Sequence, residues 1–141
     1  MSQETKLSAG TVHEGETRVE AAITAPRYVP GTPDAYATPA MVALIEITSH
    51  QLVAPTLAAD QTTVGGFIQT SHVAPTPIGQ RVRCKTILQQ IDGRKLIFNG
   101  EVFDEVEKIG EFTHHRFIVG RDRFNAKLGE KGGKAATAGR G

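Results

Sequence analysis

The segment from Thr38 to Val53 constrains the fold of this chain more strongly than any other part of the sequence. It runs TPAMVALIEITSHQLV, and its side chains are apolar on nearly every side. Thr38 followed by Pro39 is typical of an N-cap with proline at the first helical position, and Pro55 limits the helix to about residue 53. Such a helix must be enclosed by other elements. Glu46 is the exception, because a carboxylate inside a buried helix is costly unless it is paired, hydrogen-bonded or protonated.

Composition narrows the class of protein. A chain of 141 residues fits one domain that can bury a sizeable core. A net charge of +1, with both signs intermixed, gives no electrostatic case for nucleic acid or for an anionic membrane. No apolar run has the length of a transmembrane helix and no N-terminal run resembles a signal peptide, so we expect a cytoplasmic protein without a membrane partner.

The single cysteine, Cys84, excludes an internal disulfide framework and a cluster of thiolate metal ligands. It shares one face of a strand-like run with Val82, Thr86 and Leu88. This pattern favours a buried structural thiol over a reactive nucleophile.

Most of the remaining chain has the character of antiparallel strands. Asp92-Gly93 predicts a tight hairpin, since both residues tolerate the backbone of such turns, and several prolines predict a loop over residues 26–37. We expect a flexible N-terminus over residues 1–10 and a disordered tail, poor in large apolar residues, over residues 129–141. The expected strands cover residues 15–23, 62–74, 80–91, 94–104 and 109–119.

These elements predict an α+β domain over residues 11–128. Its antiparallel sheet of about five strands curls around one central helix, because this is the simplest way to enclose a helix that is apolar all round. The arrangement is the hot-dog fold. One helix cannot cover both ends of such a sheet, so we expect two copies to associate edge to edge as a homodimer.

His72 is the first candidate for chemistry. Alternation along its strand places it on the side expected to face the helix, together with Val64, Gly66, Ile68 and Thr70. The imidazole is then either a hydrogen-bonded core group or a partner of Glu46, whose charge would tune its pKa.

Other polar groups leave their roles open. Glu46 and His50 lie four residues apart and could meet on one helix face. With His72 or His114 they could hold a metal, but no metal-binding spacing is present, so we expect no metal and no cofactor. Arg116 shares the face of His114 and is either a solvated residue of an edge strand or an anion-binding group.

The adjacent glycines Gly65 and Gly66 lie within an expected strand. No helix follows them directly, so they are a weak match to a phosphate-binding loop. They mark either a simple bulge or a backbone kept bare so that a ligand group can approach an amide N–H.

Several motifs together resemble fluoroacetyl-CoA thioesterases and their hot-dog relatives, over roughly residues 35–128. Threonine, glutamate and histidine follow the family's order and spacing. The motifs are Ala37-Thr38-Pro39-Ala40-Met41-Val42 with Glu46, Gly65, Ser71-His72-Val73-Ala74-Pro75-Thr76-Pro77-Ile78-Gly79, Asp92-Gly93-Arg94-Lys95-Leu96, Ile109-Gly110-Glu111, Thr113-His114-His115-Arg116 and Arg123-Phe124-Asn125-Ala126-Lys127.

The resemblance implies a catalytic group of Thr38, Glu46 and His72. His72 is expected to act as general base and acid, Glu46 as an orienting or nucleophilic carboxylate, and Thr38 as a nucleophile or a hydroxyl that holds water. Gly65 is expected to donate a backbone hydrogen bond near the thioester carbonyl, and Arg116 to help position substrate. Thioester hydrolysis needs an activated oxygen, a proton acceptor and donors at the developing negative charge.

The position of Thr38 sets a geometric problem. If the helix starts there, Glu46 lies about 12 Å further along the axis, and the hydroxyl and the carboxylate do not touch. Either the helix begins later, with Thr38 in a loop that folds back, or a partner subunit completes the site. We expect the later start.

Residues 24–37 depart from the resemblance. Fluoroacetyl-specific members resemble one another in a longer aromatic lid, whereas this segment is short and proline-rich, with Tyr28 and Tyr36 as its only aromatic residues. We therefore expect an acyl-CoA thioesterase with a reduced lid that hydrolyses a short-chain acyl thioester, coenzyme A being part of the substrate. The alternative is a non-catalytic hot-dog module that binds acyl-CoA or another small ligand.

Overall fold

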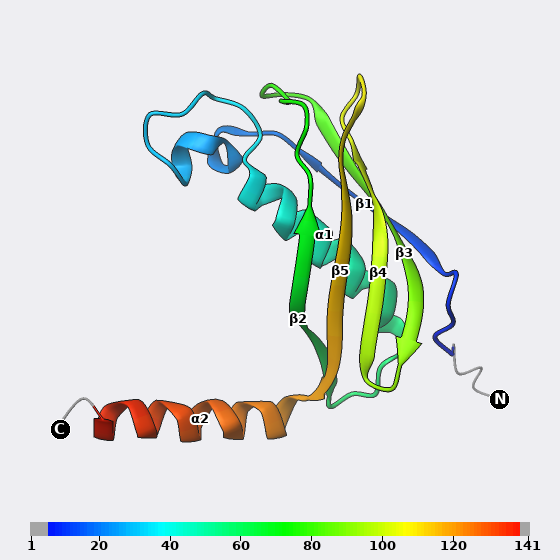
Figure 1. Ribbon diagram of the computed structural model, residues 1–141, viewed down its shortest axis with the longest axis vertical. Coiled ribbons are helices and arrows are strands. Elements are labelled where there is room, and N and C mark those ends of the chain that lie inside the picture. Colours follow the sequence, from blue (N-terminus) through cyan, green and yellow to red (C-terminus); the bar gives the residue numbers. More distant parts are fainter. Residues whose placement is uncertain (1–5, 139–141) are drawn as a thin grey trace.

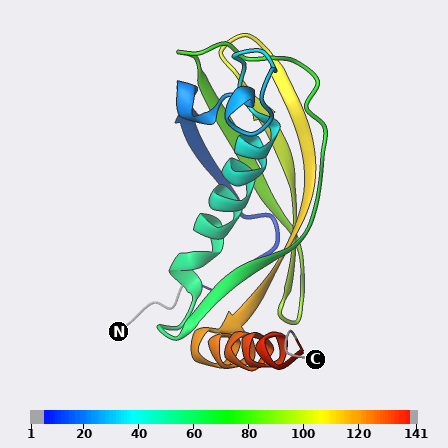
Figure 2. The ribbon, with the colours of Figure 1, turned by 90° about the vertical axis from the view of Figure 1, so that its left-hand side faces the viewer.

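The computed structural model describes residues 6–138 and has a five-stranded antiparallel sheet with helix α1, Thr38–Val53, against one face (Figure 1). Figure 2 shows the sheet curving along the length of this helix. The expected α+β arrangement, with an antiparallel sheet of five strands and a central helix, is confirmed. Across the sheet the strands follow the order β1 (Val12–Arg18), β3 (Arg81–Asp92), β4 (Lys95–Phe103), β5 (Lys108–Gly120) and β2 (Gln61–Thr70).

The core lies between α1 and the sheet. Met41 and Ile45 of α1 are fully buried, as are Leu96 and Phe98 of β4, and all four belong to one hydrophobic cluster. Burial of an aliphatic or aromatic side chain of this size stabilises a fold by about 1.5–3 kcal/mol. Successive side chains of a strand point to opposite faces of the sheet, so alternate residues of β4 and β5 face the helix.

A β-bulge interrupts the pairing of β2 with β5 between Gly65 and Phe67. It adds Gly66 to β2, so the alternation of side chains changes phase there. Val64 and Gly66 consequently lie on the opposite face from Ile68 and Thr70. The prediction that all four residues share one face with His72 is therefore wrong. Strand β2 is also one edge of the sheet, since β5 is its only partner among the described strands.

The first strand differs from the expected one. Strand β1 begins at Val12 and ends at Arg18, and residues Ala21–Ile23 form a short 3-10 turn, η1, instead of continuing it. Gly15 lies in the middle of β1, where an added Cβ would overlap the Thr48 hydroxyl of α1. The glycine lets this edge strand approach the helix closely.

The loop over residues 26–37 includes part of a second 3-10 turn, η2 (Ala25–Arg27), and a third, η3 (Ala54–Thr56), follows α1. The expected hairpin joins β3 to β4, with Asp92 paired to Lys95 and Gly93 at a φ of 61°. Glycine is favoured at such a position because positive φ strains other residues.

The two ends of the chain differ in part from the expectations. Within the N-terminal segment, Leu7 packs against the core and Gly10 N–H donates to Leu88 O at 2.7 Å, whereas residues 1–5 lie outside the described residues. At the other end, helix α2 (Arg121–Ala138) extends through most of the segment that we expected to be disordered. Its lysine, alanine and glutamate residues favour a helix, and residues 139–141 lie outside the described range. Across the described residues, no helix combines the length and the apolar character needed to cross a membrane.

Candidate active site

Helix α1 begins at Thr38, with Ala37 as its N-cap residue. No side chain caps this helix, and the Thr38 hydroxyl lies 2.7 Å from Nδ1 of His72 instead. Both the assignment of Thr38 as N-cap and the later helix start are therefore wrong. Thr38 is the first helical residue, and its hydroxyl is directed to the imidazole.

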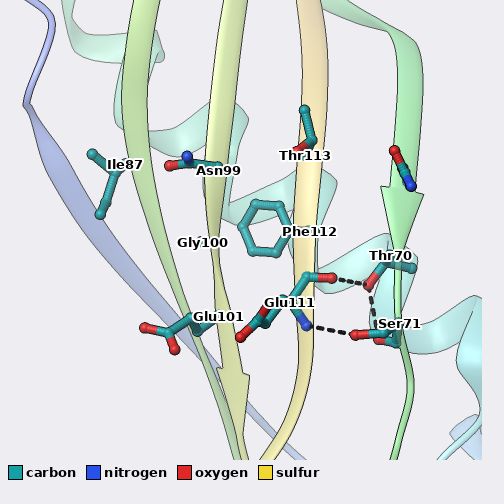
Figure 3. Close-up of a pocket in the computed structure, with 10 residues that line it drawn as sticks. Thr70, Ser71, Ile87, Asn99, Gly100, Glu101, Glu111, Phe112 and Thr113 are labelled. Atoms are coloured by element: carbon teal, nitrogen blue, oxygen red, sulfur yellow. Dashed lines mark hydrogen bonds between the residues drawn. The ribbon is translucent and has the colours of Figure 1, made fainter.

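His72 is held by the chain on either side of it. Ser71 N–H donates to Glu111 O at 3.0 Å, and Val73 N–H donates to Ile109 O at 2.8 Å, so the pairing of β2 with β5 continues past the end of the strand. Figure 3 shows the Ser71 hydroxyl beside the backbone of Glu111, from which it accepts a hydrogen bond at 3.0 Å. This backbone pairing fixes His72 opposite the start of α1.

Gly110 of β5 makes the close approach of this segment to the sheet geometrically feasible. An added Cβ at Gly110 would overlap the Ser71 carbonyl oxygen and would lie 3.3 Å from Cε of Met41. The segment that carries His72 and the first turn of α1 therefore both depend on a bare backbone at this position.

The environment of His72 favours a neutral imidazole. Burial lowers the pKa of His72 below its usual value of 6.5. Its Nε2 atom is buried and has no hydrogen-bond partner among the described residues. The ring of Tyr36 meets the imidazole edge-on, with 6.2 Å between ring centroids. A hollow of about 280 Å³ adjoins the imidazole, lined by Ala35, Tyr36, His72, Val73, Ala74 and Pro75.

Glu46 lies in a second cluster on α1. Its side chain is 43% exposed, and Oε1 accepts a hydrogen bond from Nη1 of Arg116 at 3.1 Å. The helix is not enclosed on every side, since Ala43, Ile47 and Gln51 form an exposed stripe. The expectation of a fully buried carboxylate is therefore wrong for the single chain.

The two clusters stay apart within one chain. Glu46 is bonded to Arg116, whereas His72 is bonded to Thr38. The α-helical rise places Glu46 about 12 Å from Thr38 along the axis of α1. One chain therefore presents two half-sites, and the direct pairing of Glu46 with His72 that we expected is absent from its described residues.

Arg116 is 8% exposed, so it is not a solvated residue of an edge strand. Nε donates to the Thr63 hydroxyl at 2.8 Å, Nη2 donates to Thr63 O at 3.2 Å, and Nη1 lies 3.2 Å from Nε2 of His114. Its contact with Glu46 of α1 places the guanidinium on the helix side of the sheet. It is held on several sides and presents Nη1 to Glu46.

Gly65 leaves room for the carboxylate of Glu46. An added Cβ would overlap Oε1 of Glu46 and lie 3.4 Å from Nη1 of Arg116. At Gly66 an added Cβ would instead overlap the ring of Phe117. The bulge thus turns two adjacent glycines toward different neighbours, and only Gly65 belongs to the half-site of Glu46.

Comparison with known proteins places this geometry in a family. Residues 19–122 match the fluoroacetyl-CoA-specific thioesterase family. The chain belongs to this family. It is 34% identical over 99 residues to the fluoroacetyl-CoA thioesterase of Streptantibioticus cattleyicolor, covering 70% of this chain and 71% of that protein. The predicted family and the class of thioester hydrolases are confirmed.

Solved structures agree with this assignment. A structure of the fluoroacetyl-CoA thioesterase FlK superposes with a TM-score of 0.87 at 28% identity, over 90% of this chain and 98% of that chain. A thioesterase superfamily member from Thermus thermophilus superposes with a TM-score of 0.87 at 21% identity, over 94% and 98% of the two chains, and shows a shared fold.

The sequence analysis missed Thr63 of the second half-site and weighed His50 and His114 there only as possible metal ligands. Thr63 and His114 contact Arg116, and His50 Nδ1 lies 2.7 Å from the Thr63 hydroxyl. The bulge at Gly66 hid Thr63, because strict alternation puts it on the wrong face. The spacing of His114 and Arg116 on one strand face was the available signal.

The remaining candidates lie elsewhere. Cys84 is fully buried, and burial raises the pKa of its thiol to about 12, with a hydrogen bond to Thr48 opposing the shift.

Within residues 6–138, no three histidine, cysteine or acidic side chains are grouped so that they could hold a metal. A hollow of about 630 Å³ on the sheet includes none of the predicted site residues (Figure 3); its lining includes Ile87, Asn99, Glu101, Glu111 and Thr113.

Proposed function

We propose that this protein is a homodimeric acyl-CoA thioesterase that hydrolyses a short-chain acyl thioester. The observation that carries the proposal is the 2.7 Å contact between the Thr38 hydroxyl and Nδ1 of His72, in a member of the fluoroacetyl-CoA-specific thioesterase family. A hydroxyl beside an imidazole of lowered pKa is an arrangement for moving protons during acyl transfer.

In the proposed mechanism, His72 is the general base and then the general acid. Its neutral imidazole takes a proton from the attacking oxygen and returns it to the thiolate of coenzyme A. The attacking oxygen is that of Thr38, that of a water molecule held by Thr38, or a carboxylate oxygen of Glu46, which has no proton to lose. An acyl group formed on Thr38 or Glu46 is then released by water, whose proton His72 takes. Gly65 donates its backbone N–H near the carbonyl oxygen, and Arg116 keeps the carboxylate of Glu46 in place.

The two half-sites support the homodimer. Within the described part of the chain, the outer edge of strand β2 has no partner, and Gly65, Gly66 and Phe67 on it are exposed. Exposed edges invite pairing with another chain, and a two-fold axis beside β2 would turn the two copies of α1 in opposite directions. We therefore propose that Glu46 of the partner subunit faces the Thr38–His72 half-site.

The proposed substrate is a short acyl group without selection for fluorine. The segment over residues 24–37 folds back on itself, with Ala25 N–H donating to Ala35 O at 2.9 Å, and its exposed end carries Tyr28 and Val29. Tyr36 is buried beside His72, so one aromatic ring remains at the acyl site. A short segment of this kind supports a small pocket without an extended aromatic lid.

Release of free thiol from a panel of acyl-CoA thioesters tests the function. We expect turnover of short acyl groups, with acetyl-CoA and fluoroacetyl-CoA differing by less than about 100-fold in kcat/KM, since contacts without a dedicated polar partner discriminate weakly between similar groups. Glu46→Gln and His72→Ala should each abolish turnover while the dimer stays folded. Unchanged hydrolysis in both variants would overturn the proposal.

Acid quenching during turnover, followed by mass spectrometry of peptides, identifies the attacking oxygen. An acyl group on Thr38 marks the hydroxyl as nucleophile, and an acyl group on Glu46 marks the carboxylate. An unmodified site together with turnover marks water as the nucleophile.

A further inference from the structure

The imidazole of His114 joins two parts of the Glu46 half-site. The side chain is 1% exposed and lies on β5 two residues before Arg116. Its Nδ1 atom is 2.7 Å from the carbonyl oxygen of Phe67. A carbonyl oxygen only accepts hydrogen bonds, so Nδ1 carries the hydrogen.

The other ring nitrogen faces Arg116. Nε2 of His114 lies 3.2 Å from Nη1 of Arg116. A guanidinium only donates hydrogen bonds, so Nε2 presents its lone pair. The two contacts together select one state of the ring, which is neutral with its hydrogen on Nδ1.

These contacts connect the backbone of β2 to the carboxylate. Phe67 closes the bulge that begins at Gly65, and the same Nη1 that contacts His114 donates to Glu46 at 3.1 Å. Thr63 holds the remaining guanidinium nitrogens through its hydroxyl and its carbonyl oxygen. A change at His114 therefore acts on the position of Nη1 and on the bulge, while Thr63 still holds the rest of Arg116.

We propose that His114 is a positioning residue for thioester hydrolysis. It holds Nη1 of Arg116 against Glu46, and it fixes the bulge that carries Gly65, through its two ring nitrogens at the same time. The proposal rests on the proposed function, because the carboxylate and the glycine matter for catalysis only if this site hydrolyses thioesters. His114 itself touches no reacting atom.

Two amide variants separate the two contacts. The amide of glutamine reaches the place of Nε2, so His114→Gln keeps an acceptor for Arg116. The amide of asparagine lies near the place of Nδ1, so His114→Asn keeps a donor for Phe67 and loses the acceptor. We expect kcat to fall about tenfold or more in His114→Asn with KM changed less than about twofold, and His114→Gln to recover most of the loss.

His115→Gln is the matched control. His115 is the next residue of the same strand, but it lies on the opposite face and stacks on the ring of Phe67, 4.6 Å between centroids. The kcat of the His115→Gln variant should stay within about twofold of the wild-type value. Equal losses in His114→Asn and His114→Gln that follow their melting temperatures would show a merely structural role and overturn the proposal.

Nitrogen-15 NMR of the wild-type imidazole provides a readout that is independent of turnover. We expect His114 to carry its hydrogen on Nδ1 at neutral pH. A hydrogen on Nε2 in an active protein would overturn the positioning role while leaving the proposed function intact. Absence of thiol release by the wild-type protein, with the hydrogen on Nδ1, would instead overturn the proposed function and the catalytic meaning of this contact.

Discussion

Burial of the His72 imidazole, beside the Thr38 hydroxyl, sets the protonation state in which the site can work. Burial lowers the pKa of His72, so the neutral form, which can accept a proton, persists to lower pH than in a solvent-exposed histidine. Deprotonated His72 is the active form in the proposed mechanism, so activity should be lost only when pH falls through this lowered pKa.

The first prediction concerns the acid limb of the pH profile. We expect kcat/KM for thiol release to fall with a midpoint below pH 6.5, the usual value for histidine. The pKa of His114 is also lowered, chiefly by burial, so the His114→Gln variant serves as control. A limb that stays at the same pH in this variant does not arise from His114, and a midpoint above pH 6.5 in the wild-type protein would contradict its assignment to His72.

The second prediction compares the adjacent glycines. Gly65→Ala places a methyl group where Oε1 of Glu46 lies, so the carboxylate must move away from Arg116. We expect kcat to fall about 100-fold, since a displacement of about 1 Å at a catalytic group can have an effect of this size. Gly66→Ala instead meets the ring of Phe117 and should lose stability with a smaller loss of kcat. Similar losses of kcat in the two variants would contradict the placement of Gly65 in the site.

At the scale of elements, irregular backbone positions both half-sites. The bulge of β2 turns Gly65 and Thr63 toward Arg116 and Glu46, and the paired segment that follows β2 brings His72 to the start of α1. Gly110 is the point at which this segment and the first turn of the helix both approach β5. A bare backbone there is a condition for the contact between Thr38 and His72.

The third prediction follows from Gly110. In Gly110→Ala the added methyl group pushes the Ser71 carbonyl away from β5, and His72 moves with it. We expect kcat to fall about tenfold or more while a folded dimer is retained. Gly100→Ala is a matched control, because its methyl group would overlap the Lys85 carbonyl and the ring of Phe112. Circular dichroism and thiol release, measured on both variants, distinguish lost stability from a displaced histidine.

Regular patterns in the sequence predicted much of the fold. Helix α1 ends at Val53 as expected, because Pro55 limits it, although it starts at Thr38 and not later. The Asp92-Gly93 hairpin follows from turn chemistry. The first strand was misplaced because Gly15, which appeared to begin it, lies in its middle, where the helix needs the space.

The candidate site was predictable in its residues but only in part in its arrangement. An unusual carboxylate in an apolar helix drew attention to Glu46, yet its contact with Arg116 depends on the phase change at the bulge. One inserted residue cannot be recognised from alternation alone here. Two adjacent glycines have no side chains, so they do not show which face of the strand each one occupies. The separation of Thr38 from Glu46 followed from helix geometry once the helix start was known.

At the scale of the whole molecule, the separation of the two half-sites makes assembly part of the proposed mechanism. The Thr38–His72 contact and the Glu46–Arg116 contact lie on different turns of α1, and the outer edge of β2 has no partner within residues 6–138. We therefore propose that each active site is built from Thr38 and His72 of one subunit and Glu46 of the partner subunit.

Subunit complementation tests this claim most directly. His72→Ala and Glu46→Gln chains carrying different tags are co-expressed, and the mixed dimer is isolated through both tags. One of its two sites then combines an intact Thr38–His72 half-site with an intact carboxylate. We predict about half of the wild-type thiol release from the mixed dimer and almost none from either parent dimer. A mixed dimer as inactive as its parents would contradict a site shared between subunits.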